Sequence, residues 1–239
     1  MAAATPRRDA PAPLNERLRA ERGSFKPLPQ TGPEAAAVGR SFWDYFNRKA
    51  RVLTGPEAAE SSLSAITEPP LVLHLATHGF FLAARADGTD RPLTLAGLAL
   101  AGANLGLAGK LGPGHQDGIL YALEAQDLNL EGTRLVTLSA CDTGRGALDR
   151  SEGVYGLVRA FQIAGAQAVL MSLWPLDDAL AAEFMGDFYR RWLVAGPNSD
   201  PSDALRAARL EWIGDKRDAR RQDPAYWAPF VLMERRQGI

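Results

Sequence analysis

The chain has 239 residues, of which 46% are hydrophobic and 23% charged, a globular composition with enough residues for a sizeable core. Its formal net charge of −1 gives no electrostatic basis for binding nucleic acid or an anionic membrane. No window approaches the length of a transmembrane helix, and no secretory signal is recognisable. A single cysteine excludes an intramolecular disulfide. We therefore expect a cytoplasmic protein.

The chain begins with residues rich in alanine, proline and arginine. Residues 1–30 are expected to form a poorly ordered leader, and residues 31–239 a single domain. A helix is predicted from Pro33, with apolar residues at helical spacing (Val38, Phe42 and Tyr45). A short strand at residues 51–53 and a second helix from Pro56 are predicted to follow.

Short apolar runs then predict the strands of a sheet. Residues 71–77 (LVLHLAT), 133–140 (TRLVTLSA) and 168–173 (AVLMSL) have the length and content of strands that are buried on both faces. A closing strand is predicted at residues 227–233, near an edge because it contains Pro229.

Helical patterns alternate with these runs. One begins near Ser151 and carries an apolar stripe (Val154, Leu157, Val158 and Phe161). Another opens at Asp177 and Asp178 with its own stripe (Leu180, Phe184, Phe188 and Trp192), and a third begins at Asp200. Alternating strands and helices indicate an α/β protein with a mostly parallel sheet.

Residues 102–118 stand apart because they contain six glycines (at 102, 106, 109, 112, 114 and 118). Glycine at this density leaves the backbone weakly restrained. We expect a mobile surface loop, and the alternative is a loop that orders on substrate binding or is itself cleaved.

Two reactive side chains follow predicted strands. His78 comes just after residues 71–77, and Cys141 just after residues 133–140. Ligands of open α/β sheets bind at the carboxyl ends of the strands, so both side chains are expected at one edge if the strands are neighbours. There an imidazole can serve a thiol as general base. The N–H groups of Gly79 and Cys141 could then stabilise an oxyanion.

Other interpretations of these residues exist. A lone cysteine after a strand is commonly a small apolar filler, although the polar DTGRG run after Cys141 favours an exposed loop. His74 and His78 lack the helix and glutamate of a zinc motif, so we expect no metal and take His74 as a structural residue. His115 is expected at the surface.

The sequence also contains weak patterns for nucleotide binding and for the selection of a charged substrate residue. Residues 144–146 (GRG) lack the rest of a phosphate-binding loop or dinucleotide fingerprint, so we expect no cofactor. Asp142, Asp177 and Asp178 could select a basic substrate residue. Asp177 and Asp178 are equally suited to starting a helix.

The residues also resemble those of a known family. The segments LVLHLATHGFF (71–81) and LVTLSACDTGRG (135–146) resemble the histidine and cysteine motifs of CHAT domains, caspase-like peptidase modules often fused to tetratricopeptide repeats. Further similarity lies in LAGLALAGAN (95–104), DGILYALEAQDLNL (117–130), EGVYGLVRAFQIAGAQAVLMSLWPLDD (152–178) and AYWAPFVLM (225–233). The resemblance covers residue 26 to the C-terminus.

The resemblance implies a caspase–hemoglobinase-like three-layer α/β/α sandwich. It implies that His78 and Cys141 match the catalytic dyad and that Gly79 matches the oxyanion donor. Ser172, Leu173 and Trp174 lie where caspases and separases form the pocket for the residue before the cut. Separases carry an aspartate after the corresponding tryptophan, whereas Pro175 stands here, which argues against arginine specificity unless Asp177 or Asp178 substitutes.

The family pattern leaves two functions open. The first is a cysteine endopeptidase acting on a protein or peptide, latent until a tetratricopeptide-repeat or other regulatory partner activates it. The second is a catalytically idle interaction module in a signalling or defence assembly. CHAT domains usually have additional strands before the segment PLPQTGPEA, so the sheet is expected to be short or the chain to be a fragment.

Overall fold

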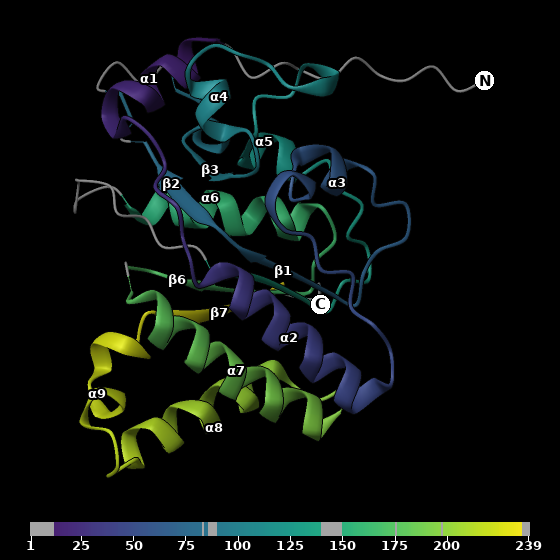
Figure 1. Ribbon diagram of the computed structural model, residues 1–239, viewed down its shortest axis with the longest axis vertical. Coiled ribbons are helices and arrows are strands. Elements are labelled where there is room, and N and C mark those ends of the chain that lie inside the picture. The colour runs from purple at the N-terminus through teal and green to yellow at the C-terminus, as the bar shows by residue number, and fades with distance from the viewer. Residues whose placement is uncertain are drawn as a thin grey trace.

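The computed structural model describes residues 12–82, 84–85, 90–139, 150–174, 176–196 and 198–235 (Figure 1). Its main sheet has the strand order β1-β5-β6-β7. The first three strands are parallel, and β7 runs antiparallel at the edge. The four strands are β1 (Val72–Ala76), β5 (Leu135–Ser139), β6 (Ala168–Ser172) and β7 (Phe230–Glu234). This arrangement confirms the predicted α/β class with a mostly parallel sheet.

Helices cover both faces of the main sheet and make three layers (Figure 1). Alternate side chains of each strand face opposite layers, so Val136 and Val169 pack in one core cluster and Leu135 and Leu170 in the other. One layer contains α6 (Arg150–Ile163) with α3 (Glu60–Ser64) and α5 (Ala122–Ala125), and the other contains α2 (Thr31–Phe46), α7 (Asp178–Ala195) and α8 (Pro201–Gly214).

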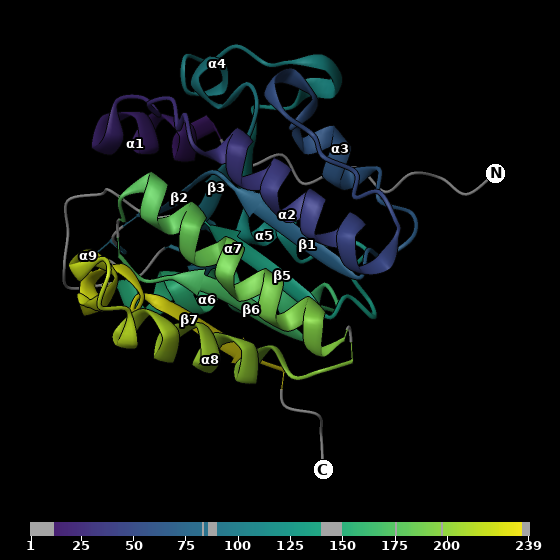
Figure 2. The ribbon, with the colours of Figure 1, turned by 60° about the horizontal axis from the view of Figure 1, so that its bottom comes forward.

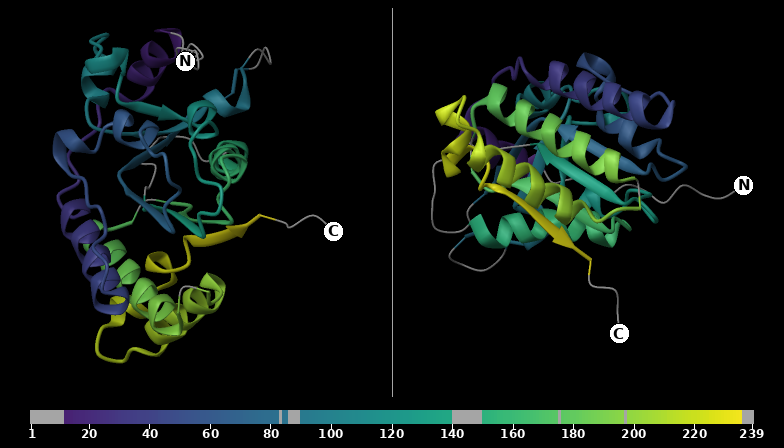
Figure 3. Two further views of the ribbon diagram at one scale, coloured as in Figure 1. Left: turned by 90° about the vertical axis from the view of Figure 1, so that its right-hand side faces the viewer. Right: turned by 90° about the horizontal axis from the view of Figure 1, so that it is seen from below.

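The layer of α2, α7 and α8 is held by large aromatic side chains. The stripe predicted on α7 is confirmed, since Phe184, Phe188 and Trp192 are all fully buried. Phe184 stacks on Phe230 of β7 at 4.7 Å between ring centroids. Figures 2 and 3 both show α2 running beside α7. None of the described helices combines the length and apolar character needed to cross a bilayer.

A second sheet was not predicted from the sequence. It is antiparallel, with the order β2-β3-β4, and its strands are β2 (His78–Phe81), β3 (Ala96–Ala99) and β4 (Ile119–Tyr121). The chain passes from β1 into β2 through Thr77 alone. His78 therefore lies at the junction between the two sheets.

The segment expected as a leader is partly helical. Helix α1 (Ala12–Arg22) buries Leu18 fully against the second sheet, in a cluster with Phe80 and Tyr121. Asn15 accepts a hydrogen bond from the Tyr121 hydroxyl at 2.9 Å. Residues 12–30 are thus tied to the domain, because Leu14 and Leu18 form one apolar face of a helix.

Other elements near the N-terminal half also differ from expectation. Residues 51–53 are not in a strand, and the predicted helix from Pro56 is divided into η1 (Gly55–Glu57) and α3. The remaining elements are η2 (Pro92–Thr94), α4 (Ala103–Leu107), η3 (Pro113–His115), α9 (Ala219–Gln222) and η4 (Pro224–Tyr226).

The two ends of the glycine-rich segment 102–118 are packed, whereas residues 108–115 between them are exposed. Ala103 and Leu107 of α4 are buried, and a Cβ at Gly106 would overlap the carbonyl oxygen of Asp117. Gly118 has φ of +76°, and a Cβ there would meet the backbone of residues 102–103. Two of the glycines are therefore required by close backbone contact, which composition alone does not distinguish from flexibility.

Gly106 and Gly186 give a matched test of this packing, since both lie inside helices. Gly106→Ala is expected to lower the free energy of unfolding by about 2 kcal/mol or more, because the added methyl has no room. Gly186→Ala meets no atom within 4 Å and is expected to raise it by about 0.5–1 kcal/mol. Urea unfolding followed by circular dichroism measures both, and equal effects would contradict the assigned packing.

Candidate active site

The candidate site lies at the carboxyl ends of the parallel strands. Strands β1 and β5 are neighbours, with Ala76 in register with Ser139, and the Thr77 N–H donates to the Ser139 carbonyl at 3.3 Å. His78 comes two residues after Ala76, and Cys141 comes two residues after Ser139. Cys141 and Asp142 themselves lie outside the described residues. The described strands nevertheless lead toward both reactive positions at one edge of the sheet.

The His78 ring is oriented by a backbone group. Its Nε2 lies 2.6 Å from the carbonyl oxygen of Lys26. A carbonyl can only accept a hydrogen bond, so Nε2 carries the proton and donates it. In the neutral ring Nδ1 is then the unprotonated nitrogen, and it is the one able to take a proton from a nucleophile. This partner cannot be predicted from the sequence, because any residue at position 26 supplies the same carbonyl.

The segment that carries the Lys26 carbonyl is clamped in place. Asn104 accepts a hydrogen bond from the Phe25 N–H at 2.8 Å and donates one to the Phe25 carbonyl at 2.9 Å. The Phe25 ring is buried, with its centroid 5.5 Å from that of His78 and 6.2 Å from that of Phe80. Asn104 thus positions the histidine's support from a distant part of the chain.

Gly79 is buried, and the register of β2 on β3 sets the direction of its backbone groups. Leu82 donates to the Leu95 carbonyl at 2.7 Å, and residues alternate along an antiparallel ladder. His78 and Phe80 therefore exchange hydrogen bonds with β3, whereas the Gly79 N–H and C=O point away from that strand. This direction is compatible with the expected oxyanion role.

The expected substrate-pocket residues follow β6, the next strand of the same edge. Ser172 ends β6 and is 3% exposed, and the Leu173 N–H donates to the Pro229 carbonyl at 3.0 Å. Trp174 is 37% exposed, and its indole N–H donates to the Ala225 carbonyl at 3.1 Å. A half-exposed indole held in one orientation can form a pocket wall.

The two adjacent aspartates mark the start of α7. The Asp177 carboxylate accepts hydrogen bonds from the N–H groups of Ala179 and Leu180, both at 3.1 Å, and so caps the helix. The structural interpretation of Asp177 is therefore supported. Asp178 is the first residue of α7, and its side chain lies outside the described part of the structure.

His74 takes part in a buried chain of polar contacts on the opposite side of β1. Its Nε2 lies 3.0 Å from Glu34 Oε1, and its Nδ1 lies 3.2 Å from the Tyr189 hydroxyl. That hydroxyl is also 2.7 Å from Thr137 Oγ1, and burial raises the pKa of Tyr189 far above its ordinary value. Both nitrogens of His74 are thus occupied by protein partners, as expected for a structural histidine. Within the ranges that the structure describes, no three His, Cys, Asp or Glu side chains are grouped to hold a metal ion.

Comparisons with known proteins place the chain among relatives. The family model described as the CHAT domain matches residues 2–235. Tetratricopeptide repeat protein 28 of Homo sapiens is 31% identical over 121 residues, which are 51% of this chain and 5% of that protein. The Mus musculus protein of the same name is 38% identical over 115 residues, 48% of this chain and 4% of that protein. The matched region is thus a small part of each relative.

The buried polar chain predicts a stability effect. Tyr189→Phe removes the hydroxyl shared by His74 and Thr137, and it is expected to lower the free energy of unfolding by about 1–3 kcal/mol, because both partners stay buried. The matched control is Tyr155→Phe at a side chain that is 63% exposed, where we expect a change within about 0.5 kcal/mol. Denaturant unfolding of the two variants makes the comparison, and an unchanged Tyr189→Phe protein would contradict the network.

Proposed function

Because the chain belongs to the CHAT domain family and has its caspase-like α/β fold, we propose that it is a cysteine endopeptidase whose dyad is His78 and Cys141. The observation that carries the proposal is the register of β1 on β5, in which Ala76 pairs with Ser139. Each reactive residue follows its strand by the same two positions. Adjacent parallel strands lie about 4.8 Å apart, so their extensions begin within reach of one another.

In the proposed reaction His78 acts first as base and then as acid. Nδ1 takes the proton of the Cys141 thiol, and the thiolate sulfur adds to the carbonyl carbon of the scissile peptide bond. His78 then gives that proton to the leaving amine as the C–N bond breaks. Water, deprotonated by His78, hydrolyses the resulting thioester and restores the thiol. The N–H groups of Gly79 and Cys141 stabilise the oxyanion in both halves of the reaction.

The Lys26 carbonyl has a defined role in this scheme. When His78 takes up the second proton, its ring becomes a cation, and the hydrogen bond from Nε2 to Lys26 becomes charge-assisted. Hydrogen bonds to charged groups contribute about 1.5–3 kcal/mol. This contact holds the ring in one orientation while it carries the transferred proton, and Asn104 keeps the acceptor in place.

The substrate is proposed to be a protein or peptide. Ser172, Leu173 and Trp174 would form the wall of the pocket for the residue before the cut, and Asp142 or Asp178 could contribute charge there. Asp177 is less suited to this role than the sequence alone indicated, because its carboxylate already caps α7.

A second candidate is an interaction module in which the dyad is idle or awaits a partner. It is favoured by the edge of the main sheet at β1, since within the described ranges β1 pairs with β5 alone. The relatives are tetratricopeptide repeat proteins, so a repeat protein is one candidate for the activating partner.

Thiol labelling distinguishes the two candidates cleanly, because Cys141 is the chain's one cysteine. For the enzyme, a peptidyl acyloxymethyl ketone is expected to alkylate Cys141, and His78→Gln is expected to slow alkylation at least about tenfold through loss of the base. His115→Gln is the matched control at an exposed histidine and should leave the rate unchanged. Cys141→Ala should abolish both labelling and hydrolysis of a peptide library. Slow labelling that ignores His78 would favour the interaction module.

Asn104 is predicted to be a positioning residue. Asn104→Ala releases Phe25, so the imidazolium loses its fixed acceptor and proton transfer from Cys141 becomes less favourable. We expect the rate at which the ketone alkylates Cys141 at pH 7 to fall at least about threefold, because the base that takes the thiol proton is no longer held in one orientation. Asn129→Ala removes a hydrogen bond to the Thr67 carbonyl instead and should leave the rate unchanged. A loss of stability without a change in the labelling rate would contradict the positioning role.

A further inference from the structure

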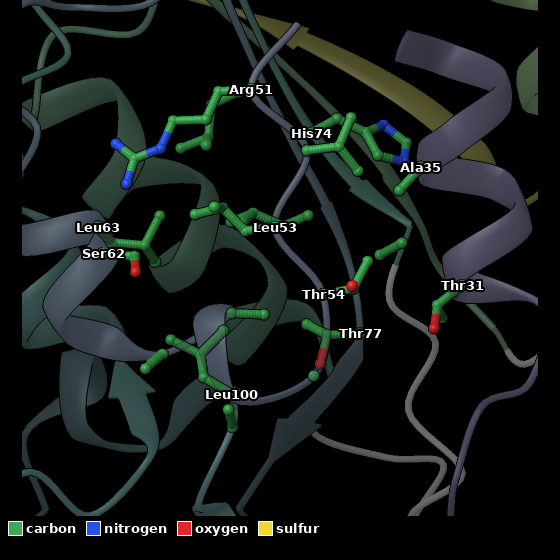
Figure 4. Close-up of a pocket in the computed structure, with 18 of the residues that line it drawn as sticks. Thr31, Ala35, Arg51, Leu53, Thr54, Ser62, Leu63, His74, Thr77 and Leu100 are labelled. Carbon is green, nitrogen blue, oxygen red and sulfur yellow. The ribbon is translucent and has the colours of Figure 1, made fainter. Parts of the chain in front are cut away.

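A large cavity of about 1240 Å³ lies beside the outer edge of β1. Its lining comes from α2, from α3, from β1 itself and from the segment between η1 and α2, as the close-up in Figure 4 shows. Ala35, Thr54, Leu63 and His74 are among the labelled residues around it. The cavity is therefore bounded on one side by the edge of a sheet.

That edge of β1 has unpaired backbone groups. The Arg134 N–H donates to the Leu71 carbonyl, and the Thr77 N–H donates to Ser139, so odd-numbered residues direct their backbone groups to β5. Val72, His74 and Ala76 direct theirs to the cavity, and no strand of the described structure pairs with them. An unpaired, half-buried strand edge is a template for another strand.

Residues 51–54, which belong to no helix or strand, line the same cavity. Residues 51–53 have the sequence of a strand, and the neighbouring Thr54 has extended dihedral angles of φ −137° and ψ 162°. Thr54 accepts a turn hydrogen bond from Glu57, and residues 51–53 make no backbone hydrogen bond within the described structure. Among the described residues, the segment predicted there as a strand pairs with no other strand.

The walls of the cavity are apolar on both sides of the β1 plane. Val38 and Phe42 of α2 pack in the core cluster on one side, and Leu63 and Ile66 pack in the cluster on the other. A strand placed beside β1 would thus be buried on both faces, which requires consecutive apolar residues rather than alternation.

The rim of the cavity is basic. Lys26, Lys49 and Arg51 line it and are exposed, and in the described ranges none of them makes an ion pair. Glu68 is the acidic residue of the lining. An apolar segment that enters the cavity is therefore expected to bind more tightly when acidic residues flank it.

We propose that this cavity is a docking site for an extended peptide of a partner polypeptide, which adds as a strand to the free edge of β1. The peptide has a centre of about five apolar residues, matching the five residues of β1, with acidic residues beside it. Main-chain hydrogen bonds to Val72, His74 and Ala76 hold it. This inference does not depend on the proposed peptidase activity, because no step of it involves Cys141.

The backbone contribution is tested with peptides. The probe is a fluorescein-labelled peptide with a Val-Leu-Val-Val-Ile centre flanked by aspartates, and binding to the Cys141→Ala chain is followed by fluorescence anisotropy. Two control peptides carry N-methyl groups on alternate residues, one for each phase of the strand. The control in which the methyl groups replace the N–H groups directed at β1 is expected to bind at least about tenfold more weakly. It loses its hydrogen bonds to β1 but keeps all of its side chains. Equal binding of all three peptides would overturn strand addition.

The site is tested with paired variants. Ala35→Trp places a large ring in the cavity and should reduce binding at least about tenfold, whereas Ala195→Trp, at an exposed position of α7, should not. Arg51→Glu should weaken the aspartate-flanked peptide and strengthen a lysine-flanked one, and Arg48→Glu, outside the lining, should do neither. If Ala35→Trp fails to fold, the comparison of Arg51→Glu with Arg48→Glu still tests the site.

The remaining outcomes also decide the matter. If the chain alone forms a dimer in analytical ultracentrifugation that Ala35→Trp abolishes, the occupant is a second copy and the proposal of a separate partner is wrong. If no peptide binds at concentrations up to the millimolar range, the proposal is likewise overturned. Either result leaves the His78-dependent labelling of Cys141 unaffected, so the two proposals fail separately.

Discussion

The pairing of β1 with β5 is the constraint on which the candidate site depends, and a polar contact defines its register. Both strands are apolar on both faces, so hydrophobic burial alone tolerates a shifted alignment. His74 and Thr137, however, are direct register partners, and both bind the Tyr189 hydroxyl from α7. If the alignment of the two strands shifted by one residue, the side chain of either His74 or Thr137 would face the apolar layer that contains α6. This network, on the α7 side of the sheet, thus favours the register in which Ala76 lies beside Ser139.

The site is assembled from segments that lie far apart in the sequence. The junction between the two sheets supplies His78, the N-terminal segment supplies the Lys26 carbonyl, and α4 supplies the clamp through Asn104. Each depends on packing of the second sheet, where Phe25 and Phe80 are in contact. The burial of Ala103 and Leu107 in α4 holds Asn104 in place, and Asn104 in turn supports the acceptor.

Much of the main sheet could be predicted from the sequence, because long apolar runs and helical stripes are local signals. The stripe of α7 and the cap at Asp177 were both recognisable. The second sheet was missed because its strands have only three or four residues, too few to show a period. Helix α1 was missed although Leu14 and Leu18 have helical spacing, since the alanine- and proline-rich composition around them indicated disorder.

The site itself was only partly predictable. The end of a predicted strand indicated His78. The Lys26 carbonyl could not be predicted, because it is a main-chain group that any residue would supply. Asn104 lay within a segment that resembles the family, but its role needs the fold that brings it to Phe25. Residues 51–53 have the sequence of a strand, and their unpaired state follows from what lies beside β1 rather than from their own composition.

Phe25 and Lys26 have a double position, because they support His78 and also line the cavity beside β1. If a molecule in that cavity binds more tightly when this segment is in place, its binding also stabilises the segment in the position that supports the His78 ring. The coupling free energy is the same in both directions. Binding at the edge of β1 would then affect His78 without any further residues between the two sites. Phe25 and Lys26 would be sufficient to couple the two sites.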